Sequence, residues 1–240
     1  MKLFEIIPFV DYTSLNNFES VESITSFVEK AIGYHQRGYS VAGVCTYSYY
    51  SKFLVDHLQG IPVKSVVVLG GFPHSQIPLE IKLKELDHAV RQGIDEIDIV
   101  ISHHLIQSEN YDDLMKELKL LRNHAKELTL KIILETGHFE DLVQLEKVAK
   151  LVCESGCDFL KTSTGKIPEG ATPEKFKILC KVIKEHFEET GKRIGVKASG
   201  GIRTIEQAKV YISMVKETLG EDFLDAKYFR IGASSLLNEI

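Results

Sequence analysis

The chain has 240 residues, 44% of them hydrophobic and 26% charged, and this composition excludes a disordered, collagen-like or disulfide-rich miniprotein. The 29 Lys and Arg residues and 34 Asp and Glu residues are mixed along the chain and give a net charge of −5, so we expect no nucleic-acid partner. Apolar runs stay far below the ~18 residues of a membrane span, and the first residues lack the apolar core of a signal peptide. We therefore expect a cytoplasmic protein without a membrane partner.

Apolar, β-rich segments alternate with segments of helical spacing from one end of the chain to the other. The first strand is predicted over residues 3–10, and the first helix begins near Val21. The other strands are predicted over residues 41–47, 63–69, 96–102, 130–136, 158–164, 195–199 and 228–232. The other helices are predicted near residues 49–58, 79–92, 114–125, 139–154, 173–189 and 205–219, with a short eighth helix from Ser235. Ser20 and Thr172 precede helical patterns and are predicted helix starts.

Eight units of about 30 residues account for the whole length and predict an α/β protein, a (β/α)8 TIM barrel forming one domain over residues 1–240. Strands that are apolar throughout and alternate with helices indicate parallel pairing through right-handed crossovers. A doubly wound open sheet is the alternative, but it needs a glycine-rich turn after the first strand. Residues 8–13, Pro-Phe-Val-Asp-Tyr-Thr, contain no glycine.

In such a barrel the active site lies at the carboxyl ends of the strands. Lys161 and Lys197 occupy matching places in the sixth and seventh predicted strands. Two buried ammonium groups repel each other, so one is expected to lose its proton well below its solution pKa and become a nucleophile for Schiff-base formation. Asp98, within the fourth strand, is a candidate proton carrier. The alternative is that all three side chains form a structural ion pair.

Two short segments predict a phosphate site. Gly200-Gly201 follows the seventh strand and Gly232-Ala233-Ser234-Ser235 follows the eighth, where barrels commonly bind phosphate through backbone N–H groups. Lys166 and Arg203 lie near these segments and could supply positive charge. The Gly200-Gly201 pair by itself could also be only a turn.

Other polar residues favour simpler interpretations. No third ligand stands at convincing spacing from His103, His104 and His138, so no metal is predicted. Lys131 and Glu135 are predicted to form an interior ion-pair network. Four cysteines without a Cys-x-x-Cys pair indicate packed thiols in a reducing compartment, although the place of Cys45 on a site-facing strand makes its sensitivity to alkylation worth testing.

The segments Lys-Thr-Ser-Thr-Gly at 161–165 and Lys-Ala-Ser-Gly-Gly at 197–201, in this order, are highly specific. With these motifs, the chain resembles the deoxyribose-phosphate aldolase family of class I aldolases. The resemblance covers essentially the whole chain and rests on residues 11–16, 44–47, 71–74, 95–98, 131–137, 159–166, 197–203 and 229–235.

The resemblance implies reversible cleavage of 2-deoxy-D-ribose 5-phosphate to acetaldehyde and D-glyceraldehyde 3-phosphate, without metal or organic cofactor, by a cytoplasmic homodimer of nucleoside catabolism. Lys161 would form the Schiff base, Lys197 would lower its pKa, Asp98 would carry the proton through a water, and Asp11 would assist. The resemblance assigns the substrate pocket to Thr13, Asn16, Cys45 and Thr164, and the phosphate site to Lys166, Gly200, Gly201, Gly232, Ser234 and Ser235.

Three departures from the family pattern affect these expectations. The sequence ends at Ile240 without the terminal tyrosine of some members, so proton exchange would depend on Asp98, Lys197 and water, with lower turnover. Ser75 also differs from the usual residue and affects loop geometry, and residues 102–104 differ and affect subunit contacts and pocket shape. Another Schiff-base aldolase acting on a different phosphosugar, or a non-catalytic phosphosugar-binding barrel, remain the alternatives.

Overall fold

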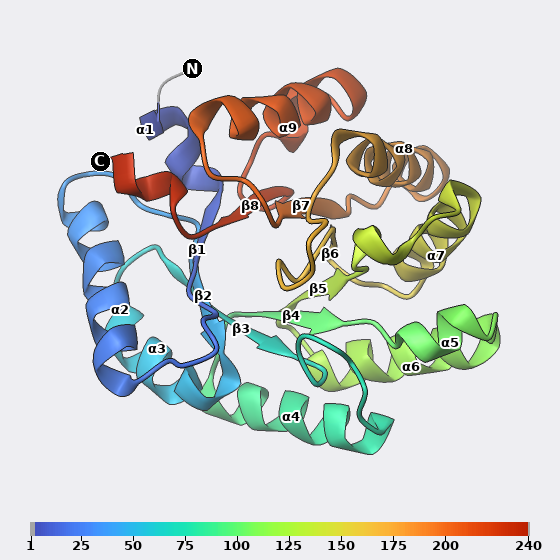
Figure 1. Cartoon of the computed structure of the whole chain (residues 1–240), viewed down its shortest axis with the longest axis horizontal. Coiled ribbons are helices and arrows are strands. Elements are labelled where there is room, and N and C mark those ends of the chain that lie inside the picture. The colour runs from blue at the N-terminus through green and yellow to red at the C-terminus, as the bar shows by residue number, and fades with distance from the viewer. Residues whose placement is uncertain (1–2, 240) are drawn as a thin grey trace.

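The computed structural model describes residues 3–239 and is a closed barrel of eight parallel strands in the order β1 to β8. Figure 1 looks down the barrel, with the strands at the centre and the helices in a ring around them. The (β/α)8 barrel expected from the sequence is confirmed. Residues 1–2 and 240 lie outside the described residues, and so does the expectation about the end of the chain at Ile240.

Seven of the eight predicted strands overlap closely with the observed ones. The strands are β1 Val10–Thr13, β2 Gly43–Tyr47, β3 Lys64–Leu69, β4 Glu96–Val100, β5 Thr129–Ile133, β6 Phe159–Lys161, β7 Gly195–Ser199 and β8 Phe229–Ala233. The prediction over residues 3–10 was wrong, because α1 (Leu3–Ile6) and the 3-10 helix η1 (Ile7–Phe9) precede β1. Ile6 and Ile7 are nevertheless buried, and an apolar run alone does not separate a strand from a short buried helix.

The helices begin where the sequence places capping residues. Ser20 accepts the backbone N–H of Ser23 at the start of α2, and Thr172 accepts that of Lys175 at the start of α8. The helices after α1 are α2 Val21–Gln36, α3 Ser51–Leu58, α4 Leu79–Gln92, α5 His103–Gln107, α6 Tyr111–Ala125, α7 Leu142–Glu154, α8 Pro173–Thr190 and α9 Ile205–Thr218. The short 3-10 helices are η2 Ser48–Tyr50, η3 Thr136–His138, η4 Glu221–Phe223 and η5 Leu236–Glu239. Among residues 3–239, no helix is long and apolar enough to cross a lipid bilayer.

Strand register brings charged residues to one level inside the barrel. Lys161 of β6 pairs with Lys197 of β7, and Asp98 of β4 pairs with Lys131 of β5. Lys197 in turn pairs with Arg230 of β8. Because neighbouring parallel strands run in the same direction, these side chains meet in the barrel interior instead of at separate places on the surface. The hydrophobic core surrounds them, between the strands and the outer helices.

Candidate active site

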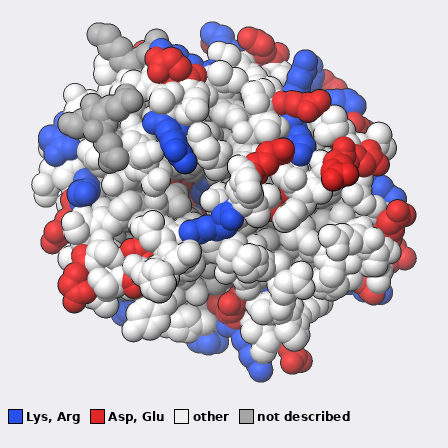
Figure 2. Space-filling model, viewed as in Figure 1, with Lys and Arg blue, Asp and Glu red and all other residues white. Residues whose placement is uncertain are grey.

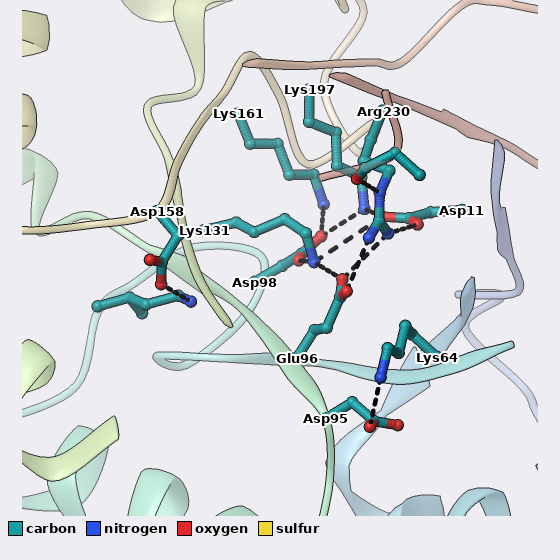
Figure 3. Close-up of polar contacts among 12 residues, drawn as sticks. Asp11, Lys64, Asp95, Glu96, Asp98, Lys131, Asp158, Lys161, Lys197 and Arg230 are labelled. Carbon is teal, nitrogen blue, oxygen red and sulfur yellow. Dashed lines mark hydrogen bonds and ion pairs between the residues drawn. The ribbon is translucent and has the colours of Figure 1, made fainter. Parts of the chain in front are cut away.

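Two lysines approach the same carboxylate oxygen. The Nζ atoms of Lys161 and Lys197 lie 2.8 Å and 2.7 Å from Oδ2 of Asp98. Lys197 also lies 2.5 Å from Oδ2 of Asp11. Figure 3 shows both lysines extending toward Asp98 from neighbouring strands. The structure therefore brings together the four residues that the sequence nominated for catalysis.

A second layer of charges lies on the far side of these carboxylates. Lys131 contacts Glu96 at 2.6 Å and Asp98 at 3.0 Å, and Arg230 contacts Asp11 at 2.6 Å and Glu96 at 2.7 Å. Lys131 thus joins the predicted interior network. The predicted partnership with Glu135 was wrong: within residues 3–239, Glu135 forms no ion pair and bonds Thr164 instead.

The floor beneath this layer is an aromatic ring. Lys131 and Arg230 each lie 5.8 Å from the centroid of the Phe159 ring. Gly195 of β7 makes room for this ring, since a Cβ at that position would lie 2.4 Å from the Cε1 atom of Phe159. The Phe159 ring therefore packs beneath the charged cluster.

The seven ionisable groups of this cluster do not balance. Four of them are basic and three are acidic, so the fully charged cluster has one excess positive charge, and loss of one proton removes it. The groups are Asp11, Glu96, Asp98, Lys131, Lys161, Lys197 and Arg230. Burial and the charge of Lys197 lower the pKa of Lys161, against the attraction of Asp98. Burial also acts on Lys197, but Asp11 and Asp98 together raise its pKa. The neutral amine is therefore expected at Lys161.

The basic groups of the cluster lower the pKa values of Asp98 and Asp11. Burial acts to raise the pKa of Asp98, but the charges of Lys131, Lys161 and Lys197 outweigh it and hold this pKa well below its usual value. The pKa of Asp11 is lowered in the same way, mainly by Lys197 and Arg230. Asp98 accepts hydrogen bonds from both lysine nitrogens.

A cavity of about 440 Å³ opens above Lys161. Figure 2 shows this face of the molecule hollowed at its centre, with basic side chains beside the hollow. Ten residues that the sequence nominated line the cavity: Thr13, Asn16, Lys161, Thr164, Lys166, Gly200, Gly201, Arg203, Gly232 and Ser234. The other five do not line it: Asp11, Asp98 and Lys197 lie in the charged cluster, Cys45 lies near enough to interact with the charges of Lys161 and Lys197, and Ser235 follows Ser234.

Glycines shape the outer wall of the cavity. Gly200 and Gly201 have φ angles of 87° and 83°, a conformation that other residues adopt only with strain. A Cβ at Gly200 would lie 2.8 Å from the Cα of Gly170, so the two loops approach too closely for a side chain. Arg203 lines the same cavity, which adds a second basic residue to Lys166 at its outer end.

Sequence reasoning missed several lining residues. Ser14, Leu15 and Ile202 line the cavity between nominated neighbours, and Phe27 reaches it from α2. The first three stand in the same loops as nominated residues, and that proximity was the available signal. Phe27 sits in an ordinary apolar helical pattern that carries no such signal.

The structure also places Cys45 and the histidines that were considered as metal ligands. Cys45 is fully buried in a small apolar cluster with Leu15, Val66 and Val68, and burial raises the pKa of its thiol to about 11. The rings of His103 and His138 pack with their centroids 5.2 Å apart. Within residues 3–239, no group of three His, Cys, Asp or Glu side chains is arranged to bind a metal ion.

Comparison with known proteins adds to this geometry. The model of the DeoC/LacD family of aldolases matches residues 14–239. Human deoxyribose-phosphate aldolase is 34% identical over 99% of this chain and 79% of its own length. The mouse protein of the same name is 35% identical with the same coverage.

Solved structures agree with the sequence comparison. A protein described as QR15, an aldolase, superposes with a TM-score of 0.80 at 31% identity and covers 98% of this chain and 95% of its own. A putative deoxyribose-phosphate aldolase from Coccidioides immitis gives a TM-score of 0.83 at 28% identity, covering 100% of this chain and 87% of its own.

Proposed function

Because this chain belongs to the DeoC/LacD family of aldolases, we propose that it reversibly cleaves 2-deoxy-D-ribose 5-phosphate to acetaldehyde and D-glyceraldehyde 3-phosphate through a Schiff base on Lys161. The observation that supports this most directly is the pair of lysines on one oxygen of Asp98, with the pKa of Lys161 lowered and that of Lys197 raised. Only Lys161 of the two lines the cavity.

The proposed reaction begins with the neutral amine of Lys161 in the cavity. The Nζ of Lys161 adds to the aldehyde carbon of the substrate, and loss of water gives an iminium ion. Removal of the proton from the C3 hydroxyl breaks the C2–C3 bond, releases glyceraldehyde 3-phosphate and leaves an enamine. Protonation at C2 and hydrolysis then release acetaldehyde and regenerate Lys161. The iminium ion accepts the electron pair, so this sequence needs no metal or organic cofactor.

The charged cluster supplies the proton transfers in this proposal. Asp98 lies within hydrogen-bonding distance of both lysine nitrogens, so it can relay a proton to or from the reacting carbon through a water. Lys197 keeps its proton and stabilises the ionised carboxylates, and Asp11 fixes Lys197 from the other side. These assignments account for the four nominated catalytic residues.

Phosphate binding is proposed at the outer end of the cavity. Gly200, Gly201, Gly232 and Ser234 offer backbone N–H groups and a hydroxyl, and Lys166 and Arg203 offer positive charge. Thr13 and Asn16 line the region between these groups and Lys161. We also propose a role in nucleoside catabolism as a homodimer, and a cytoplasmic location, with which the four free cysteines among the described residues are consistent.

The decisive experiment is trapping with borohydride in the presence of acetaldehyde, followed by peptide mapping. Reduction of the Schiff base should leave an ethyl group on Lys161, and Lys161→Leu should keep its fold and lose kcat by on the order of 10⁴-fold or more. Lys181→Met, on the outer surface of α8, is the matched control and should behave like the parent chain. Absence of an adduct at Lys161 would refute the mechanism and favour a phosphosugar-binding barrel without catalysis.

A second assay separates the related enzyme reactions. Release of acetaldehyde from 2-deoxyribose 5-phosphate should exceed release of aldehydes from ketose phosphates by a wide margin in kcat/KM. Faster cleavage of a ketose phosphate, with trapping still at Lys161, would retain the Schiff base and replace the substrate.

A further inference from the structure

Glu135 is a buried acid that the proposed reaction does not use. It is 2% exposed, stands two residues after the end of β5, and has φ and ψ angles of 53° and 61°. Such a left-handed conformation is uncommon for a residue other than glycine, and it persists where surrounding contacts enforce it. Within residues 3–239, no basic group pairs with its carboxylate.

Both side-chain hydrogen bonds of Glu135 go to one residue of the cavity wall. Its Oε1 accepts the backbone N–H of Thr164 at 3.2 Å, and its Oε2 accepts the Thr164 hydroxyl. The hydroxyl oxygen of Thr164 in turn accepts the backbone N–H of Lys166 at 3.1 Å. A single carboxylate thus fixes both the backbone and the side chain of Thr164.

These contacts determine what Thr164 can offer a ligand. A threonine hydroxyl has one proton to donate and two lone pairs to accept. The proton is directed at Glu135 and one lone pair receives the N–H of Lys166, so one lone pair remains. Thr164 therefore presents an acceptor, and no donor, to a molecule in the cavity that it lines.

The place of Thr164 along the chain indicates which part of a substrate it would meet. It stands between Lys161, where the aldehyde would react, and Lys166, at the phosphate end, and all three line the same cavity. The C4 hydroxyl of the substrate, between the carbon that is cleaved and the phosphate, would therefore lie nearest to Thr164.

We propose that Glu135 is a positioning residue that orients the Thr164 hydroxyl. In this orientation Thr164 accepts a hydrogen bond from the C4 hydroxyl of the substrate, which lies between the carbon that is cleaved and the phosphate. This inference rests on the proposed function for the identity of the substrate. It predicts a preference for an alcohol over an ether at C4, since an ether brings only lone pairs toward the lone pair of Thr164.

Glu135→Gln tests the proposal because it keeps the shape of the side chain and reverses the direction of its hydrogen bond with the Thr164 hydroxyl. The glutamine amide would donate to the Thr164 oxygen, which would turn the Thr164 proton toward the cavity. The measurement is kcat/KM for condensation of acetaldehyde with D-glyceraldehyde 3-phosphate and with its 2-O-methyl ether. The alcohol-to-ether ratio should fall by about tenfold in Glu135→Gln, the value of one hydrogen bond.

Three further variants separate positioning from general damage. Thr164→Val should lower the same ratio, Thr164→Ser should keep it, and the double variant Glu135→Gln/Thr164→Val should fall no further than Thr164→Val alone. The matched control is Glu85→Gln, because Glu85 also accepts two backbone N–H groups at a rim loop, those of Gly70 and Gly71, and lines no part of the cavity. Its ratio should equal that of the parent chain.

If the role of Glu135 is merely structural, Glu135→Gln should lower kcat/KM equally for the alcohol and the ether and leave their ratio unchanged. That result overturns the proposal. An unchanged ratio in Thr164→Val overturns it as well, even where Glu135→Gln does not fold. Calorimetric binding of sn-glycerol 3-phosphate against its 2-O-methyl ether gives the same ratio without turnover. If the parent chain lacks aldolase activity but this binding preference falls in Glu135→Gln, the proposed function fails and the role of Glu135 stands.

Discussion

One oxygen atom of Asp98 accepts hydrogen bonds from two lysines, and the other carboxylate nearby distinguishes them. Lys197 contacts both Asp98 and Asp11, whereas Lys161 contacts only Asp98. An ammonium group between two carboxylates is more stable than one beside a single carboxylate. The arrangement therefore makes Lys161, which lines the cavity, the lysine that loses its proton more easily.

Lys197→Met should raise the pH at which Lys161 becomes reactive. The substitution removes a repelling charge and leaves Asp98 and Asp11 to stabilise the ammonium form of Lys161, so its pKa rises. The midpoint of the pH profile for borohydride trapping with acetaldehyde should move upward by about one pH unit or more. An unchanged midpoint would show that Lys197 does not act on Lys161 through its charge.

Cys45 should resist alkylation in the folded protein. It is fully buried, and burial raises the pKa of its thiol from 9.0 to about 11. The reactive thiolate is then about a hundredfold less populated at pH 8 than in an unperturbed thiol. Mass spectrometry after iodoacetamide treatment should show slow labelling of the native chain and rapid labelling in urea, and equal rates in the two would contradict the buried position.

At the scale of elements, a buried ion pair joins two outer helices to the end of β4. Lys82 of α4 lies 3.0 Å from Glu117 of α6, and it also contacts Ser102, just after β4, and Ser75 of the β3–α4 loop. Lys82 is fully buried. None of these residues lines the cavity above Lys161, so the cluster connects structural elements and not substrate-binding groups.

Breaking this pair should cost stability and spare activity. Lys82→Met leaves Glu117 buried beside Ser102 without its cation, so the free energy of unfolding should fall by about 3 kcal/mol. Lys82→Met/Glu117→Leu removes both charges and should recover part of that loss. Urea unfolding measures both changes, and kcat/KM should remain at the parent value. Equal loss in the single and double variants would contradict this explanation.

The helices and strands were largely predictable because their apolar periodicity is local, but two features were not. Glu135 stands four residues after Lys131, so strand alternation placed both on one face. The strand ends at Ile133 and the backbone turns left-handed at Glu135, which redirects its side chain to Thr164. The pairing of Lys82 with Glu117 joins two helices across 35 residues, and no sequence spacing indicates such a contact.

At the scale of the whole molecule, the charged cluster connects β1, β4, β5, β6, β7 and β8 through the barrel centre. The register that aligns these strands could be expected from the sequence as matching lysine positions. The participation of Glu96 and Arg230 could not be predicted from the sequence. Arg230 reaches Asp11 and Glu96 only because the closed barrel pairs β8 with β1. The charges proposed for catalysis and the charges that hold the barrel together are therefore parts of the same network.

Acid should destabilise the folded barrel through this network. The pKa values of Asp11 and Asp98 are lowered in the folded state, so both carboxylates stay ionised there while the unfolded chain takes up protons below its ordinary value of 3.8. Their contribution is complete above that value and is lost as the pH falls toward the folded pKa.

Below about pH 4, the free energy of unfolding should fall by about 1.4 kcal/mol per pH unit for each of the two carboxylates. Denaturant unfolding at a series of pH values measures this slope. Asp98→Asn should have a shallower slope by about one proton, and an equal slope in the variant would contradict the role of Asp98.

The position of Lys161 has a consequence for the order of events in the proposed reaction. Lys161 lines the same cavity as Lys166 and Arg203, and the charged cluster and the Phe159 ring lie on its other side. With phosphate held at the end of the cavity proposed for it, the phosphorylated fragment would leave first, and the fragment bonded to Lys161 would leave after it. In the reverse direction, the small aldehyde would enter and bond to Lys161 before the phosphorylated aldehyde binds.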